Sequence, residues 1–158
     1  MNVLKKDEHN TEIVQATMQQ VIEKYKKFHA IQEVIDNGQE SVPIRWVSSS
    51  QEESNGKNTS IKARMGIRGD LESNRDSVRS VSSSTGKETL DLTLLIASDE
   101  KFLVKGADIK SVYMQGQGLQ RTIFVKPPPE ANADGKLWLL KRAAYGVLDG
   151  VICFTYDL

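Results

Sequence analysis

A single aspartate after a short apolar run is the feature that most limits how this chain can fold. Phe102-Leu103-Val104 predicts a buried strand, and Asp108 follows it, near the expected strand end. A buried carboxylate is costly unless it is ion-paired, hydrogen-bonded or bound to a metal. For an isolated aspartate, an ordinary hydrogen bond is the commoner explanation, so the neighbouring residues have to decide between the two.

The first half of the chain alternates one helix with several predicted strands. Apolar residues at 3.6-residue spacing predict an amphipathic helix over 11–28 with Thr11 as its N-cap. Asn37-Gly38 predicts the turn of a β-hairpin between strands 30–36 and 42–48. We expect a polar loop over 48–60.

The second half continues the mixture of helix and strand. A strand is expected over 61–69, and a helix over 86–98, opened by Thr85 as N-cap in a capping box and burying a leucine-rich stripe. Residues 123–126 are expected to close a hairpin with 102–109, and a further strand covers 136–141. Helices and antiparallel strands in this order predict an α+β fold.

Charge and hydropathy leave the partner open. Lys plus Arg and Asp plus Glu each number 21, so the net charge is zero. Within 101–142, however, eight basic residues face three acidic ones, and this local excess of five suits a phosphate-bearing partner or an ordinary solvated lysine face. No run has the length of a signal peptide or a membrane span, so we expect an intracellular protein without membrane contact.

Several motifs occur in a familiar order. They are Lys62-Ala63-Arg64 with Arg68-Gly69, Asp108-Ile109-Lys110-Ser111 followed by Tyr113 and Gly116, the strand 123–126 with its three prolines, and Tyr145-Gly146. Taken together, residues 12–149 resemble the reverse transcriptase domain of the Pol polyproteins of copia-type LTR retrotransposons. Gly66 and Asp70 depart from the family pattern, where a β-branched residue and an aromatic are usual.

This resemblance implies a set of site residues. Asp108 is the family's first catalytic carboxylate and Mg²⁺ ligand, and Ile109 offers its backbone carbonyl to the metal and nucleotide. Tyr113 lies under the incoming sugar, where its ring disfavours a ribose. Lys62 and Arg64, two apart on one strand face, are expected to bind the triphosphate. The remaining implied positions, Tyr145 and Gly146, lie near the templating base pair.

The resemblance also implies an architecture, which is the fingers and part of the palm of a right-hand polymerase. The implied partners are deoxynucleoside triphosphates, a nucleic-acid primer–template, and the polypeptide that forms the rest of the palm and the thumb. We expect a tail at 1–10, the partial reverse transcriptase at 11–149 and a divergent tail at 150–158, in the cytoplasm or in virus-like particles. The sequence has no adjacent Asp-Asp pair. One carboxylate does not hold two Mg²⁺ ions, so we expect no polymerisation by this chain alone. The alternatives are a non-catalytic nucleic-acid-binding or interaction module, and a decayed transposon reading frame.

Overall fold

Strands contributed by both halves of the chain form one sheet, against which a long helix packs. The structure is a computed structural model that describes residues 2–3, 11–52, 59–78 and 85–150. Its elements are, in order, β1 (Asn2–Val3), α1 (Glu12–Lys27), β2 (Ile31–Ile35), β3 (Val42–Glu52), β4 (Thr59–Ile67), α2 (Lys87–Asp99), α3 (Val112–Gln115), β5 (Phe124–Lys126) and β6 (Lys136–Leu140). Short 3₁₀ turns occur at Gly69–Leu71, Arg75–Ser77 and Pro129–Ala131. The predicted α+β class is confirmed.

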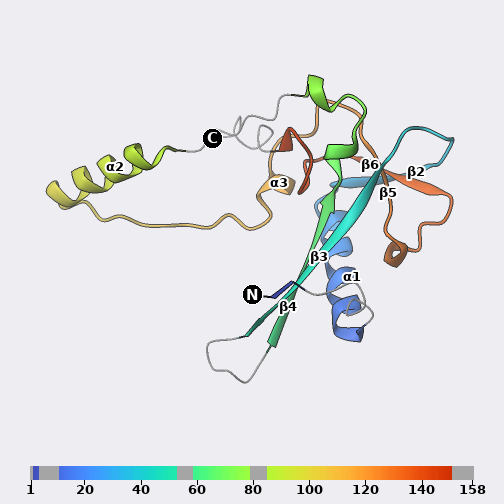
Figure 1. Cartoon of the computed structure of the whole chain (residues 1–158), viewed down its shortest axis with the longest axis horizontal. Coiled ribbons are helices and arrows are strands. Elements are labelled where there is room, and N and C mark those ends of the chain that lie inside the picture. Colours follow the sequence, from blue (N-terminus) through green and yellow to red (C-terminus); the bar gives the residue numbers. More distant parts are fainter. Residues whose placement is uncertain (1, 4–10, 53–58, 79–84, 151–158) are drawn as a thin grey trace.

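The strand order is β1-β3-β5-β6-β2, with β4 paired to β3 off this path. β3 pairs antiparallel with β4 over nine residue pairs, and parallel with β5 at its beginning. α1 crosses the sheet and packs against β4 (Figure 1). The core between them contains Trp138, Tyr25 and Met65, which are all fully buried. The fold thus joins α1 and β4, which will form two walls of the candidate site.

Local patterns predicted most elements, but not their pairing. α1 is confirmed, and its buried residues Val14, Met18, Ile22 and Tyr25 follow the predicted stripe; Thr11 is the N-cap, though its side chain makes no capping hydrogen bond. The hairpin around Asn37-Gly38 is wrong. β2 and β3 both exist, but β2 pairs with β6 and β3 pairs with β4. The turn is nevertheless present, since Gly38 has a positive φ of 82°.

Two further boundaries differ from the prediction. The expected loop over 48–60 is wrong at both ends, because the β3–β4 ladder runs on to the pair Glu52↔Thr59; residues 53–58 lie outside the described part. β5 and β6 confirm the strands expected at 123–126 and 136–141. β5, however, takes β3 and β6 as its neighbours, so the predicted hairpin with 102–109 does not form.

The expected strand before Asp108 is also wrong. Residues 102–109 form neither strand nor helix, and the side chains of Phe102, Leu103 and Val104 are 65%, 81% and 59% exposed. α2 precedes this segment and begins one residue after Gly86, its N-cap, so the expected Thr85 cap is wrong too. An apolar run becomes a strand only where a neighbouring strand completes its hydrogen bonds, and β5 is already paired on both sides.

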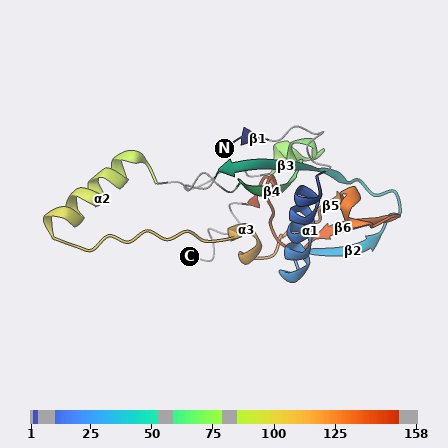
Figure 2. The same ribbon diagram turned by 90° about the horizontal axis from the view of Figure 1, so that it is seen from below.

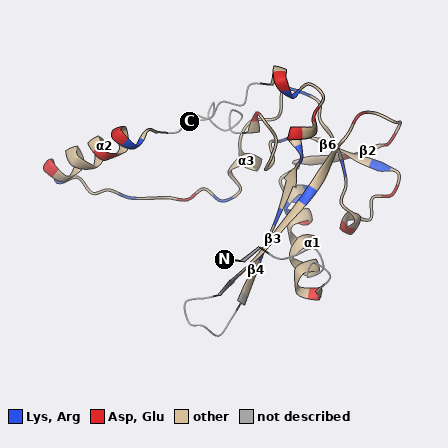
Figure 3. Cartoon of the chain, viewed as in Figure 1, with Lys and Arg blue, Asp and Glu red and all other residues tan. Residues whose placement is uncertain are grey.

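α2 stands away from the rest of the molecule in two perpendicular views (Figures 1 and 2). Its predicted leucine stripe is not buried: Leu90, Leu94 and Leu95 are 51%, 44% and 68% exposed, and Ala97 is the buried residue of the helix. Acidic residues gather toward both ends of α2, with an uncharged stretch between them (Figure 3). No helix among the described residues is long and apolar enough to cross a membrane.

Candidate nucleotide cleft

A cleft of about 400 Å³ lies between α1, β4 and the segment that begins at Asp108. Three stretches far apart in the sequence form its walls, and Tyr145 adds a fourth. A volume of this size is typical of small-molecule sites in proteins. Its lining residues are Val21, Lys24, Tyr25, Ala63, Arg64, Met65, Asp108, Ile109, Lys110, Ser111, Met114 and Tyr145.

Tyr25 fixes α1 against β4 at the base of the cleft. Its hydroxyl donates a hydrogen bond to the backbone carbonyl of Met65 over 3.1 Å, and its side chain is 1% exposed. Burial raises the pKa of Tyr25 well above its ordinary value of 10.0, and the nearby Tyr145 raises it further. The phenol therefore stays neutral and remains a donor, so the helix is anchored to β4 over the whole physiological pH range.

The structure brings four of the seven predicted site residues to this cleft: Arg64, Asp108, Ile109 and Tyr145. Tyr113, a fifth, packs edge-on against Tyr145, with ring centroids 4.9 Å apart and an interplanar angle of 79°. Such T-shaped pairs are a favourable arrangement of two aromatic rings. The cluster therefore unites residues that were predicted from three separate motifs.

Three predicted residues, Lys62, Tyr113 and Gly146, do not line the cleft themselves, and Lys62 lies outside the aromatic pair and the Tyr145-Gly146 segment. It lies on β4 opposite Ser49, two residues before Arg64, and both cations are exposed. The alternation of side chains along a strand puts them on one face, as expected. Arg64 thus reaches the cleft, while Lys62 belongs to the adjoining strand surface.

Asp108 is exposed, and among the described residues that line the cleft it carries the only carboxylate. Among the residues that the structure describes, no three His, Cys, Asp or Glu side chains are grouped so as to hold a metal ion. Mg²⁺ prefers oxygen ligands, and a two-metal site requires several of them in fixed positions. The described donors therefore do not make up a complete two-magnesium site.

The Tyr145-Gly146 segment lies directly against the edge of β4. The amide of Ile67 donates a hydrogen bond to the carbonyl of Tyr145 over 2.7 Å. Gly146 has φ of +86°, and a Cβ added to it would lie 2.1 Å from the Ile67 carbonyl oxygen. A Cβ on Gly69 would in turn lie 2.4 Å from the carbonyl oxygen of Gly146. Gly69 and Gly146, which belong to two different motifs, are thus packed against each other, and this close backbone contact explains why neither position has room for a side chain.

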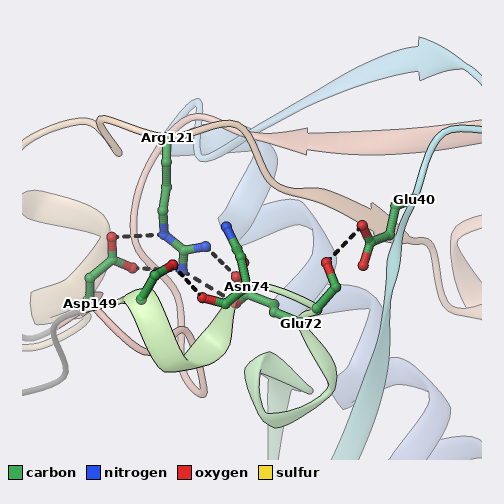
Figure 4. A network of polar contacts seen from close by, with 7 residues as sticks. Glu40, Glu72, Asn74, Arg121 and Asp149 are labelled. Atoms are coloured by element: carbon green, nitrogen blue, oxygen red, sulfur yellow. Dashed lines mark hydrogen bonds and ion pairs between the residues drawn. The ribbon is translucent and has the colours of Figure 1, made fainter.

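A partly buried ion network, which the sequence does not signal, holds the segment after Gly146 in place (Figure 4). The Arg121 guanidinium donates two hydrogen bonds of 2.9 Å to Asp149 and two more to Glu72, one of them 3.2 Å long. The Glu72 side chain is only 5% exposed. Burial alone disfavours the charged guanidinium, but the hydrogen bonds that it donates to both carboxylates outweigh this effect and raise the pKa of Arg121 above its ordinary value. Since Arg121 is 49 residues from Glu72, no local spacing predicts the contact.

Two cations of the lining were not among the predicted site residues. Lys110 is part of the Asp108 motif, and its position beside an expected ligand was the signal available. Lys24 follows the helical pattern of the outer face of α1, so periodicity alone assigns it to solvent. Its place in the cleft depends on how α1 crosses β4, and this is a property of the tertiary structure.

The basic excess over 101–142 does not form one free surface. Arg121 is held by the two carboxylates just described, and Lys136 pairs with Glu33 at 2.8 Å. Arg142 donates to the backbone carbonyls of Met114 and Gly116. Three of the eight basic residues therefore serve internal contacts.

The sequence also matches a known protein family. Residues 25–158 match the model of the family described as reverse transcriptase (RNA-dependent DNA polymerase). No curated protein and no solved structure gives a significant match to the chain. The family match covers most of the sequence and includes β4, the Asp108 segment and the Tyr145-Gly146 segment, which meet at the cleft. The chain therefore belongs to the reverse transcriptase (RNA-dependent DNA polymerase) family.

Proposed function

We propose that this chain is the fingers and first palm portion of a copia-type retrotransposon reverse transcriptase, and that it binds deoxynucleoside triphosphates. The observation that carries the proposal is the cleft, in which Arg64 from β4, Asp108 and Ile109 from the long connection, and Tyr145 meet. Residues with three different roles in the implied reaction share one cavity of suitable size.

Each residue of the cleft has a distinct proposed role. Arg64 binds the phosphates, since its planar guanidinium forms paired hydrogen bonds with phosphate oxygens, and Lys62 adds positive charge on the adjoining strand surface. Asp108 and the Ile109 carbonyl would offer two oxygen ligands to a Mg²⁺ ion, which would supply positive charge to neutralise the reacting oxygens. Tyr113, held by its contact with Tyr145, lies under the sugar and discriminates against a 2′-hydroxyl.

We further propose that nucleotide binding and nucleotide transfer are separable in this chain. The described residues offer one carboxylate in the cleft, whereas two-metal transfer needs more oxygen ligands. The missing ligands would come from the remaining palm, which we propose as the partner, together with a primer–template. The expected divergent tail and the domain boundaries stay predictions, since residues 151–158 lie outside the described part.

The test measures binding and polymerisation on the same preparation. We expect the full chain to bind a fluorescent deoxynucleoside triphosphate, and Arg64→Ala to weaken binding about tenfold, as expected for loss of a charge-assisted hydrogen bond. Arg45→Ala is the matched control, because Arg45 is an exposed arginine on the adjoining strand β3 and does not line the cleft. Equal affinities for wild type, Arg64→Ala and Arg45→Ala would refute the proposed nucleotide site.

A primer-extension assay with Mg²⁺ then tests the second part. We expect no extension product from this chain alone. A metal-dependent product that Asp108→Asn abolishes would refute the proposed separation, and it would show that the chain completes the site itself. The alternative, a non-catalytic nucleic-acid-binding module, has less support, because three of the eight cations it would use are engaged in internal contacts.

A further inference from the structure

The last turn of α1 contains three lysines, but their surroundings differ. Lys26 lies 3.8 Å from the carboxylate of Glu33, in an ion pair. Lys24 lines the cleft beside Tyr25, the residue that anchors the helix to β4. Lys27 is exposed and does not line the cleft. All three lie in the last turn, where a positive charge complements the negative end of the helix dipole, so the dipole does not account for the position of Lys24 in the cleft.

The charges that line the cleft are predominantly positive. Lys24, Arg64 and Lys110 face a single acid, Asp108, which gives three minus one, a net charge of plus two. No ion pair joins any of these three cations to an acidic side chain within the described ranges. A concave surface of one sign focuses the electrostatic potential and concentrates oppositely charged ligands. The cleft therefore suits a ligand with several negative charges.

The three cations come from three different elements. Arg64 lies on β4, Lys110 on the segment before α3, and Lys24 on α1, so a ligand between them is contacted from separate walls. The aromatic pair Tyr113–Tyr145 lies at the same cleft and offers a surface for a sugar or base. Cations on several walls together with aromatic rings are the complement of a nucleoside triphosphate, with its phosphates toward the cations.

We propose that Lys24 is a phosphate-contacting residue of this cleft, so that α1 takes part in nucleotide binding alongside β4. The inference rests on the proposed function and adds a residue that neither the motifs nor the family match assigns. A lysine ammonium is a compact charge on a flexible stem, suited to an unbranched polyphosphate chain that has no fixed orientation. Because the contact is between side chains and phosphate, it does not require a divalent metal.

The experiment measures binding of inorganic tripolyphosphate and of a deoxynucleoside triphosphate to the full chain by calorimetry, in EDTA at low salt. We expect Lys24→Ala to weaken tripolyphosphate binding about fivefold. Lys27→Ala is the matched control: it removes a lysine from the same helical turn, with the same dipole effect, and is expected to stay within about twofold of wild type. Lys24→Arg keeps the charge and is also expected to stay within about twofold.

The outcomes separate this inference from the proposed function. If wild type binds and Arg64→Ala weakens binding, but Lys24→Ala equals Lys27→Ala, the role of Lys24 is refuted and the nucleotide cleft stands. If wild type binds neither ligand, both fail. Matching thermal melts of Lys24→Ala and Lys27→Ala exclude unfolding as the cause of any difference, since both side chains are exposed on the same helix.

Discussion

Among the glycines that the structure describes, Gly146 is the one whose replacement by alanine brings the new Cβ closest to another atom, so this substitution should be strongly destabilising. The new Cβ would lie 2.1 Å from the Ile67 carbonyl oxygen, whereas ordinary contacts begin at 3.4 Å, so the two backbones must separate by about 1.3 Å (3.4 − 2.1). That movement breaks the 2.7 Å hydrogen bond from Ile67 to Tyr145, worth about 1 kcal/mol. Left-handed backbone strain adds about 1–2 kcal/mol, and overpacking about 1–3 kcal/mol.

Together these terms lower the free energy of unfolding by about 3–6 kcal/mol, a large part of the stability of a typical domain. Urea unfolding followed by tryptophan fluorescence measures it, because Trp138 is completely buried and reports loss of the core. Gly38→Ala is the control: Gly38 has nearly the same φ, +82°, but no atom lies within 4 Å of its added Cβ. It should lose only the strain, about 1–2 kcal/mol. Equal losses in the two variants would show that Gly146 is not packed on β4.

Two other perturbations test the charged contacts. Arg121→Met leaves the Glu72 carboxylate, which is 5% exposed, without its cation, so it should lower the free energy of unfolding by about 3 kcal/mol in urea unfolding. Adding Glu72→Gln to this variant should restore part of the loss. An Arg121→Met variant whose stability lies within about 0.5 kcal/mol of wild type would contradict the network. The hydrogen bond from Lys136, with smaller effects of burial and charge, holds the pKa of Glu33 below its ordinary value of 4.5. The ionised Glu33 carboxylate therefore stabilises the folded state. This contribution to stability is complete above pH 4.5 and is lost as the pH falls through the lowered pKa. Because the Glu33 side chain is 35% exposed, Glu33→Gln should lower the free energy of unfolding by only about 0.5 kcal/mol at pH 7. The difference in melting temperature between this variant and wild type should vanish in acid. A difference that grows in acid would contradict the contact between Glu33 and Lys136.

The local sequence pattern predicts those helices and strands that form whichever other element they pack against or pair with. α1 follows from its stripe of apolar residues, because any core would bury the same side of the helix. β5 and β6 follow from short apolar runs bounded by proline and glycine. The pairing of β2 with β6 does not follow, since Asn37-Gly38 forms its turn whether or not the flanking strands pair with each other. The register of a strand and the identity of the strand with which it pairs depend on side chains that are distant in the sequence, and a prediction from local sequence patterns does not include them.

The candidate site shows the same division. The motifs pointed to Arg64, Asp108, Ile109 and Tyr145, and these meet at one cleft. The predicted strand before Asp108 failed because an apolar run does not reveal whether a neighbour is available, and here Leu103 is 81% exposed. Arg121 was counted only as part of a basic excess, because its two acidic partners lie 49 and 28 residues away. Site residues that lie in short contiguous motifs could be predicted from the sequence, whereas ion pairs between distant residues could not.

The pairing of β2 with β6 has a consequence for biosynthesis. Ile31 is opposite Leu140, so 109 residues separate the partners (140 − 31). At roughly 5–20 residues per second, a ribosome takes on the order of 5–20 s to deliver the second strand after the first. During that interval β2 presents unpaired amides and carbonyls to the cell, as does the edge of β4 until Tyr145 arrives. The nascent chain should therefore depend on chaperones that shield open strand edges, and its yield should fall when translation is slowed between codons 35 and 136.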